Sequence, residues 1–257
     1  MITRYRVSLD HDSLDALAQE IMILDVAYTS PVYALQATAL AARHGQIVHG
    51  RTIPTAGVSV TIEMHTQDIA RRQEVCEMVR RWAMRGGELR VNSRPHEYLR
   101  VECDMPPVIP SDLKWTGKIT IGFTAYECVF WEQDEAWSVS VPTGEGRTMI
   151  VPGSAEETPV SVKVENSSGQ TVNSLTVTAG DTVFSFAELA LADGETLDIG
   201  YDEHGFLYIR AGNVSKMDKR TPESSDELTI QQRESAALSV TADAAVTATF
   251  TARGRSL

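Results

Sequence analysis

The sequence predicts a mostly β protein of the α+β class, with two domains and one main helix, and three patterns support this fold class. The segment from Val58 to Met64 alternates apolar and polar residues, which is typical of a half-buried strand. The segment from Ile69 to Arg85 has the apolar stripe of an amphipathic helix. Beyond residue 146, short strand-like segments are separated by turn residues at a spacing of roughly 8 to 12 residues, which favours a β-sandwich or jelly roll.

The first domain is expected to span residues 1–145 as a β-sandwich that carries the main helix at about residues 69–85. Asp68 can cap this helix, because a carboxylate at that position accepts a hydrogen bond from a free amide of the first turn. Gly86 and Gly87 then end it. A weaker pattern of the same kind predicts a second helix from Ser13 to Ile21. The strands predicted in this domain are Val58–Met64, Glu88–Val91, Tyr98–Cys103 and Lys118–Tyr126.

The boundary between the domains is predicted near Glu145. The chain between Ser138 and Pro159 is rich in proline, glycine and acidic residues, a composition that suits a domain junction. The second domain is then expected over residues 146–257, without a helix. Its predicted strands are Val160–Val164, Leu175–Thr178, Val183–Phe186, Leu197–Tyr201, Phe206–Ile209, Leu228–Ile230, Leu238–Val240 and Val246–Phe250. Its predicted turns are Ser168-Gly169, Ala179-Gly180-Asp181, Asp193-Gly194 and His204-Gly205.

The charge of the chain restricts the partners that it can bind. The 257 residues have a formal net charge of −12. Because proteins that grip DNA draw their affinity from lysine and arginine, which displace counterions from the phosphates, we do not expect such a role. An acidic wall would nevertheless suit a duct through which DNA passes, since it repels phosphates. Divided at Glu145, the charge is −5 for residues 1–145 and −7 for residues 146–257.

The sequence also indicates where the protein is made. The amino terminus lacks a secretory signal pattern, and no apolar run is long enough to cross a bilayer. The three cysteines, Cys76, Cys103 and Cys128, are too few and too widely spaced for a disulfide framework or a paired-thiol zinc site. We therefore expect a soluble protein, synthesised in a reducing compartment, with no membrane partner.

No catalytic motif is present, so we expect a protein that is not an enzyme and needs no cofactor. A Gly-x-Ser-x-Gly elbow, a phosphate-binding loop and a dinucleotide fingerprint are all missing from the sequence. His44 and His49 could in principle hold a metal, but a third ligand is lacking, and a loop or hairpin tip is the favoured interpretation. Cys76 is interpreted as a small core residue on the main helix rather than as a nucleophile.

A jelly roll also suggests an alternative function, the binding of a carbohydrate. Sugar-binding sites use exposed aromatic rings, tryptophan above all, against the apolar face of the sugar. All four tryptophans, however, precede the predicted boundary. The aromatic residues of the second domain fall within strands, where packing in the core is their expected use, and they are Phe184, Phe186, Tyr201, Phe206, Tyr208 and Phe250. Because some of these rings could face outward, glycan binding is kept as the alternative.

The order of these elements resembles that of the distal tail protein family of long-tailed, siphovirus-like bacteriophages and prophages. In the first domain the matching features are His49 to Pro54 before the alternating strand, the main helix, Leu89-Arg90-Val91, Tyr98-Leu99-Arg100-Val101 and Ile119 to Tyr126. In the second domain they are Thr158-Pro159-Val160, Leu197-Asp198-Ile199 and a final strand that ends near Phe250. The resemblance covers essentially the whole chain.

This resemblance implies a fold and a function. Family members join a β-sandwich bearing one helix to a galectin-like β-sandwich. The implied function is that of a virion structural protein, a homohexameric ring-shaped adaptor that joins the tail tube protein to the tail-tip hub of the baseplate. DNA would meet the ring only in transit through its central channel. The protein would be made in the cytoplasm of the bacterial host and located in the virion tail, and the alternative function would be recognition of a host-surface glycan.

Three residues are candidate contacts with neighbouring subunits or with the tail tube, namely Arg51, His49 and Ile53. They lie in the long connection between Gln36 and Gly57, and long connections between ordered strands are often functional. A mobile loop is the alternative interpretation of this segment.

Overall fold

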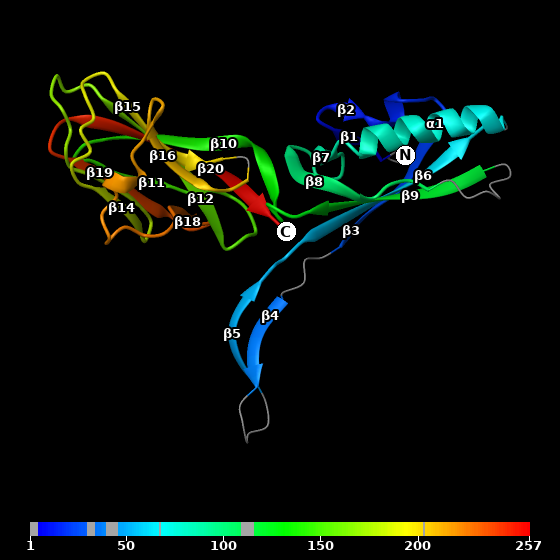
Figure 1. The fold of residues 1–257 in the computed structure, drawn as a ribbon, viewed down its shortest axis with the longest axis horizontal. Helices are drawn as coiled ribbons and strands as arrows, with labels where there is room; N and C mark the ends of the chain where they lie inside the picture. Colours follow the sequence, from blue (N-terminus) through cyan, green and yellow to red (C-terminus); the bar gives the residue numbers. More distant parts are fainter. Residues whose placement is uncertain (1–4, 30–33, 40–45, 67, 109–115, 203) are drawn as a thin grey trace. The chain divides into compact units, whose positions relative to one another are not determined.

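The computed structural model describes residues 5–29, 34–39, 46–66, 68–108, 116–202 and 204–257. It consists of two compact units, Met1–Trp131 with Leu257, and Glu132–Ser256. Strands dominate both units, and the one α-helix of the described residues, α1 (Ile69–Ala83), belongs to the first (Figure 1). The predicted fold class, mostly β with one main helix, is therefore confirmed. Within the described ranges, no helix has both the length and the apolar composition needed to cross a lipid bilayer.

The first unit is built on antiparallel strands that follow the order β3-β6-β9-β8-β7-β1-β2. These strands are β1 (Val7–Leu9), β2 (Asp12–Ser13), β3 (Ile21–Thr29), β6 (Ala56–His65), β7 (Gly87–Val91), β8 (Glu97–Met105) and β9 (Thr116–Ala125). The alternation predicted for β6 is confirmed, because its inward residues are almost completely buried, and they are Val58, Val60, Ile62 and Met64. Strands β7, β8 and β9 confirm the other strands predicted in this domain.

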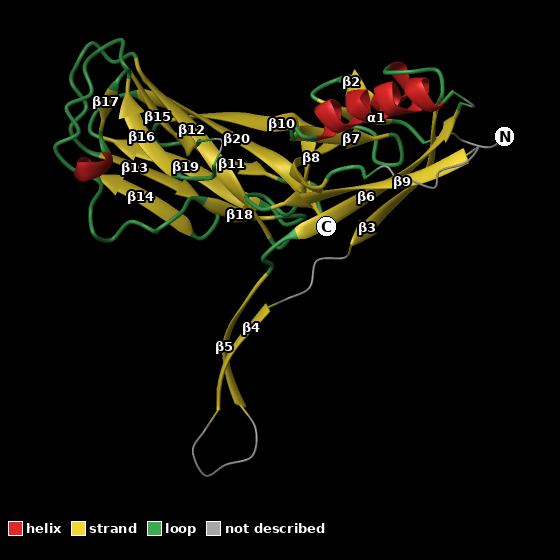
Figure 2. Ribbon diagram, turned by 45° about the vertical axis from the view of Figure 1, so that its right-hand side comes forward, coloured by secondary structure: helices red, strands yellow, loops and turns green. Residues whose placement is uncertain are grey.

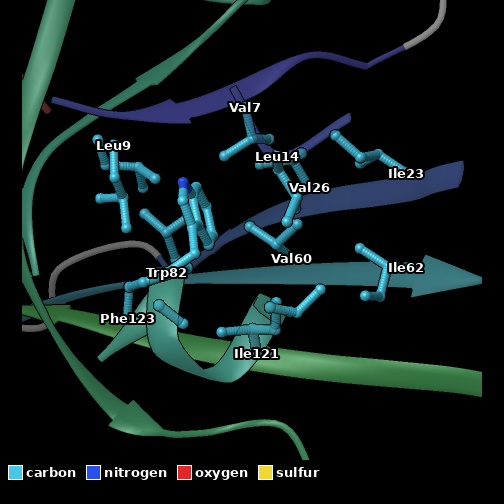
Figure 3. Packing of buried hydrophobic residues seen from close by; sticks show 14 of the residues in the cluster. Val7, Leu9, Leu14, Ile23, Val26, Val60, Ile62, Trp82, Ile121 and Phe123 are labelled. Atoms are coloured by element: carbon cyan, nitrogen blue, oxygen red, sulfur yellow. The ribbon is translucent and has the colours of Figure 1, made fainter. Parts of the chain in front are cut away.

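The helix α1 covers the buried face of this sheet. Asp68 caps it as predicted, because its carboxylate accepts a hydrogen bond of 2.9 Å from the amide of Ala70. Trp82 is 2% exposed and stands edge-on to the ring of Phe123, with 6.0 Å between the ring centroids (Figure 3). Cys76 is buried on the same face, as expected of a core residue. Ile69, which the helical pattern placed on the apolar face, is instead 69% exposed at the first turn.

The second helix predicted from Ser13 to Ile21 is wrong. Strand β2 ends at Ser13, a single 3-10 turn spans Leu14–Ala16, and strand β3 begins at Ile21. The apolar residues of this segment are nevertheless buried, with Leu14 fully enclosed in the core. A segment of nine residues is too short for a helix that is stable by itself, so the strands on either side decide its conformation.

The second unit is a sandwich of two antiparallel sheets around a core of its own. One sheet has the order β17-β16-β15-β12-β20-β10, and the other has the order β11-β19-β13-β14, while β18 pairs with one end of β12. The strands are β10 (Trp131–Pro142), β11 (Gly146–Met149), β12 (Glu157–Asn166), β13 (Leu175–Ala179), β14 (Thr182–Phe186), β15 (Thr196–Tyr201), β16 (Leu207–Ala211), β17 (Val214–Ser215), β18 (Thr229–Gln231), β19 (Ala236–Ala242) and β20 (Val246–Ser256). All eight strands predicted in this domain are present.

The division between the units lies earlier than the boundary predicted near Glu145. Strand β10 pairs with β20 and so belongs to the second unit. The breakers that suggested a linker form a turn between β10 and β11, where Gly144 has a φ of +81°. The charge is therefore unequally divided: residues 1–131 carry 14 Lys and Arg against 15 Asp and Glu, and residues 132–256 carry 9 against 20.

Candidate functional site

A two-stranded hairpin occupies the connection in which the candidate contact residues were predicted. It consists of β4 (Ala34–Ala39) and β5 (Gln46–Thr52), which pair in antiparallel register from Ala34 opposite Thr52 to Ala39 opposite Gln46. Within the described residues these two strands pair only with each other (Figure 2). An isolated two-stranded hairpin is only marginally stable in water, so a second surface is needed to hold it in a fixed conformation.

The hairpin presents apolar side chains to solvent. Leu35 is 62% exposed and Val48 is 54% exposed, and Ala34 and Ala37 are exposed as well. Apolar residues on both strands of such a hairpin are unusual, because none of the described parts of the chain removes these side chains from water. The hairpin is therefore suited to pack against another protein surface.

His49 occupies a β-bulge in this hairpin. Gln36 pairs with Gly50 and Ala37 pairs with Val48, so that His49 is the extra residue of the longer strand. Its side chain is exposed, and its Nε2 lies 2.9 Å from the hydroxyl oxygen of Thr38. A bulge bends the strand that contains it and redirects the side chain at that point. The exposed His49 side chain thus lies at the bulge of the hairpin.

The other predicted contact residues have different positions. Arg51 lies in β5 opposite Leu35, and its side chain lies outside the part of the chain that the structure describes, as does His44. Ile53 follows the hairpin, is half-buried and packs against the core of the first unit. In the described residues, no three His, Cys, Asp or Glu side chains are grouped so that they could hold a metal ion.

A long strand edge adjoins the hairpin in the sequence. Strand β3, of nine residues, pairs with β6 on one side, and none of the described strands pairs with its other side. A bulge between Ile23 and Asp25 interrupts its register, and the residues after Val26 are exposed. An open edge presents unpaired backbone donors and acceptors, which another chain can complete. The sequence reasoning did not identify this strand, although the apolar run Ile21-Met22-Ile23-Leu24 was its signal.

Two of the described thiols, those of Cys76 and Cys103, have a raised pKa. Burial raises the pKa of the Cys76 thiol, and burial together with the nearby Asp104 carboxylate raises the pKa of the Cys103 thiol. A reactive cysteine needs a lowered pKa, because the thiolate is the attacking species. Cys76 belongs to the buried core of the first unit, and Cys103 is partly buried and packs against that core.

The second unit presents aromatic residues that were not expected at its surface. Phe206, which was predicted to pack in the core, is 70% exposed just before β16. Tyr208 is half-exposed, and the guanidinium of Arg210 lies 4.6 Å from the centre of its ring. Trp137 lies in β10, so it belongs to the second unit, and it is 47% exposed. The earlier argument against glycan binding, which placed every tryptophan in the first domain, is accordingly weakened.

Comparison with solved structures shows that the chain as a whole shares a known fold. The protein is similar to the Dit protein of phage SPP1, with a TM-score of 0.74 and 10% identity, over 98% of this chain and 99% of that chain. That protein is reported as a paradigm of the hub adsorption apparatus in phages that infect Gram-positive bacteria. A chain of the phage P2 baseplate in its activated conformation with Ca gives a TM-score of 0.48 and 8% identity, over 99% and 98% of the two chains. No family model and no curated protein matches the chain.

Proposed function

We propose that the protein is a structural component of a phage tail and a member of the distal tail proteins. In this proposal, copies of the chain form a ring-shaped adaptor that joins the tail tube to the tail-tip hub and leaves a central channel for DNA. The shared fold with the Dit protein of phage SPP1, over nearly the full length of both chains, supports the proposal. The observation that carries it is the exposed hairpin β4–β5, which pairs with none of the other described strands and follows the open-edged strand β3 in the sequence.

The hairpin and the open edge lie on different elements of the same unit, which suits contacts between neighbouring copies. A contact between two different surfaces of identical chains repeats from copy to copy and closes into a ring when the rotation allows it. In this arrangement the hairpin of one copy packs its apolar residues, Leu35 and Val48, against its neighbour. His49 and Arg51 are the contact residues that we retain, and the half-buried position of Ile53 makes it a weaker candidate.

The expected ring is a homohexamer located in the virion tail, with the tail tube protein and the tail-tip hub as its partners. It would be made in the cytoplasm of the bacterial host and would act without catalysis or a cofactor. DNA would pass through the channel without being held, which is consistent with the net charge of −12.

The ring is tested by the mass of the purified full chain in solution, measured by light scattering after size-exclusion chromatography. We expect an assembly of six chains of 28.2 kDa each. The double substitution Leu35→Asp and Val48→Asp should convert it to the monomer, because two carboxylates cannot be buried at an apolar contact. Ile150→Asp, at an apolar residue of the second unit that is 56% exposed, is the matched control and should leave the assembly intact. A wild-type chain that stays monomeric at high concentration would contradict the proposal.

A second candidate function, recognition of a host-surface glycan, is favoured by the exposed rings beside β16. Tyr208 and Arg210 flank the buried Ile209 in β16, so they share the outer face of the sheet, and the exposed Phe206 lies just before this strand. An exposed ring next to a guanidinium can bind a sugar, because the ring packs against the apolar face of the sugar and the guanidinium donates hydrogen bonds to the sugar hydroxyls. Trp137 lies on β10 at the opposite edge of this sheet and cannot belong to the same platform.

A glycan array probed with the purified chain tests this second function. Signals that are lost in Phe206→Ala and kept in Trp137→Ala would support a glycan site at β16. An array without signals, or signals that both variants retain, would remove glycan recognition at β16 from consideration and leave the adaptor function unaffected.

A further inference from the structure

The second unit contains a strand edge that is closed by an irregular segment and not by another strand. Strand β14 is the last strand of the sheet β11-β19-β13-β14, and among the described strands it pairs only with β13. The segment from Lys219 to Leu228, which we call the strap, runs along the other side of β14, where Arg220 forms an isolated bridge with Phe186. Without the strap, the backbone donors and acceptors of this edge would be open to another chain.

The strap follows β14 but does not form a regular ladder with it. The amide of Thr221 donates to the carbonyl of Ser185, and the amide of Ser225 donates to the carbonyl of Val183, both at 2.8 Å. Between these two bonds the strap advances by four residues while β14 advances by two, so the strap bulges away from the strand. Pro222 lies in this bulge and has no amide hydrogen, which prevents the strap from continuing as a strand.

Serine hydroxyls take the place of the missing carbonyl acceptors. The amide of Val183 donates to the hydroxyl oxygen of Ser225, and the amide of Ser185 donates to that of Ser224, both at 3.0 Å. The hydroxyl of Ser224 also donates to the carbonyl of Ser185 at 3.1 Å. The strap therefore satisfies the edge of β14 through side chains, and its release does not require the sheet behind it to unfold.

Arg220 holds the strap in its closed position. Its guanidinium lies 5.3 Å from the centre of the ring of Phe184, which is fully buried. Its Nη1 also donates to the carbonyls of Ser225 and Asp226, at 3.3 and 3.2 Å. The two ends of the bulge are thus joined to each other and to the core side of β14.

The sequence of β14 explains why its edge needs a cover. Thr182–Phe186 consists of β-branched, aromatic and hydroxyl residues, with no charge, proline or glycine. Short segments of this composition readily pair with other strands. The strap has the opposite composition, with charged residues and a proline that oppose pairing, namely Lys219, Arg220, Pro222, Glu223, Asp226 and Glu227.

We propose that the strap is a conformational device that keeps β14 from pairing with β14 of a second copy of this chain. Two identical strands that run antiparallel can satisfy each other symmetrically, so a second copy is a complete partner for the open edge. Release of the strap leads to association of copies through the second unit. The inference goes beyond the proposed ring, because it concerns no residue of the hairpin β4–β5 or of β3.

The test removes both hydroxyls with Ser224→Ala and Ser225→Ala in the full chain. Hydrogen exchange followed by mass spectrometry should show the amides of β14 exchanging about tenfold faster than in the wild type, because they lose their acceptors. The amides of β13, which lies between β14 and β19, should stay protected and show that the sheet is folded. Light scattering should give a mass that rises with concentration above that of the wild type, whatever the mass of the wild type is.

The matched control is Ser138→Ala with Ser140→Ala, which removes two hydroxyls of β10 that lie 3.4 and 3.0 Å from those of Thr251 and Thr249. This control should change neither the exchange of β14 nor the mass. Arg220→Gln is a second variant and should act in the same direction as the loss of the serine hydroxyls, because the strap loses its bonds to the guanidinium.

A further substitution separates release of the strap from association. Val183→Lys, added to the variant without the two serine hydroxyls, should keep the fast exchange and restore the mass of the wild type, because a lysine on an edge strand opposes pairing. Exchange of β14 that is unchanged both without the serine hydroxyls and in Arg220→Gln would overturn the inference. Fast exchange without any increase in mass, or an increase that Val183→Lys leaves in place, would also overturn it.

Discussion

At the scale of single residues, the ion pair between Glu20 and Arg71 joins the start of β3 to the helix α1. The Nε of Arg71 lies 2.8 Å from a carboxylate oxygen of Glu20, and its Nη1 lies equally close to Glu74 on the helix. The hydrogen bond from Arg71 is the largest cause that lowers the pKa of Glu20 below the ordinary value of 4.5. One arginine therefore connects the helix to the sheet that it covers.

We predict that Arg71→Gln raises the pKa of Glu20 toward 4.5, as measured by NMR titration of its carboxyl carbon. Because the pKa is lower in the folded protein than in the unfolded chain, the pair stabilises the fold above pH 4.5 and loses this effect as the pH falls through the lowered pKa. The variant should therefore lose less stability between neutral and acid pH than the wild type. Arg71→Lys keeps the charge and should retain part of the shift. An unchanged pKa in Arg71→Gln would show that Arg71 does not cause the shift.

At the scale of elements, the regular repeat of apolar residues explains which strands and which helix could be predicted from the sequence. Strand β6 and helix α1 each bury one face in the core, so their apolar residues repeat at the period of the element. Strand β3 and the hairpin β4–β5 lack this signal, because exposed residues fill most of their later positions. The glycines around His49 predicted a loop or a hairpin tip, and His49 instead lies within strand β5 of the hairpin. The open edge of β3 was not, since strand pairing depends on residues distant in the sequence.

The cap of α1 gives a prediction for a whole element. Asp68→Ala should lower the free energy of unfolding of the first unit by about 1 kcal/mol, because the amide of Ala70 loses its acceptor. Asp68→Asn keeps a side-chain oxygen at the same position and should cost less. Chemical denaturation followed by the fluorescence of Trp82, which is buried at the other end of the helix, measures the effect. If alanine and asparagine proved equally harmless, the side chain of Asp68 would not be the cap.

At the scale of the whole molecule, the two units differ in charge far more than the predicted boundary suggested. The difference arises because the four acidic residues between Trp131 and Gly146 belong to the second unit. Residues 132–256 then hold an excess of eleven negative charges, whereas residues 1–131 are nearly neutral. Like charges repel one another in the compact state, and salt screens this repulsion over distances beyond about 10 Å. The stability of the two units should therefore respond differently to salt.

We predict that a fragment of residues 132–256 folds by itself, because both sheets of its sandwich and its buried core lie within it. Its melting temperature should rise when sodium chloride is added, since screening relieves the repulsion among its acidic residues. In the full chain carrying Trp137→Phe, whose remaining tryptophans all precede residue 132, unfolding of the first unit should respond less to the same range of salt. Circular dichroism of the fragment and fluorescence of the full chain make the two measurements.

The opposite outcome would be a fragment whose stability falls with salt, and it would mean that ion pairs outweigh the repulsion. Such pairs exist in this unit, because Arg255 contacts Glu132 at 2.7 Å. The sign of the salt effect thus decides whether net charge or local pairing governs the electrostatics of the second unit.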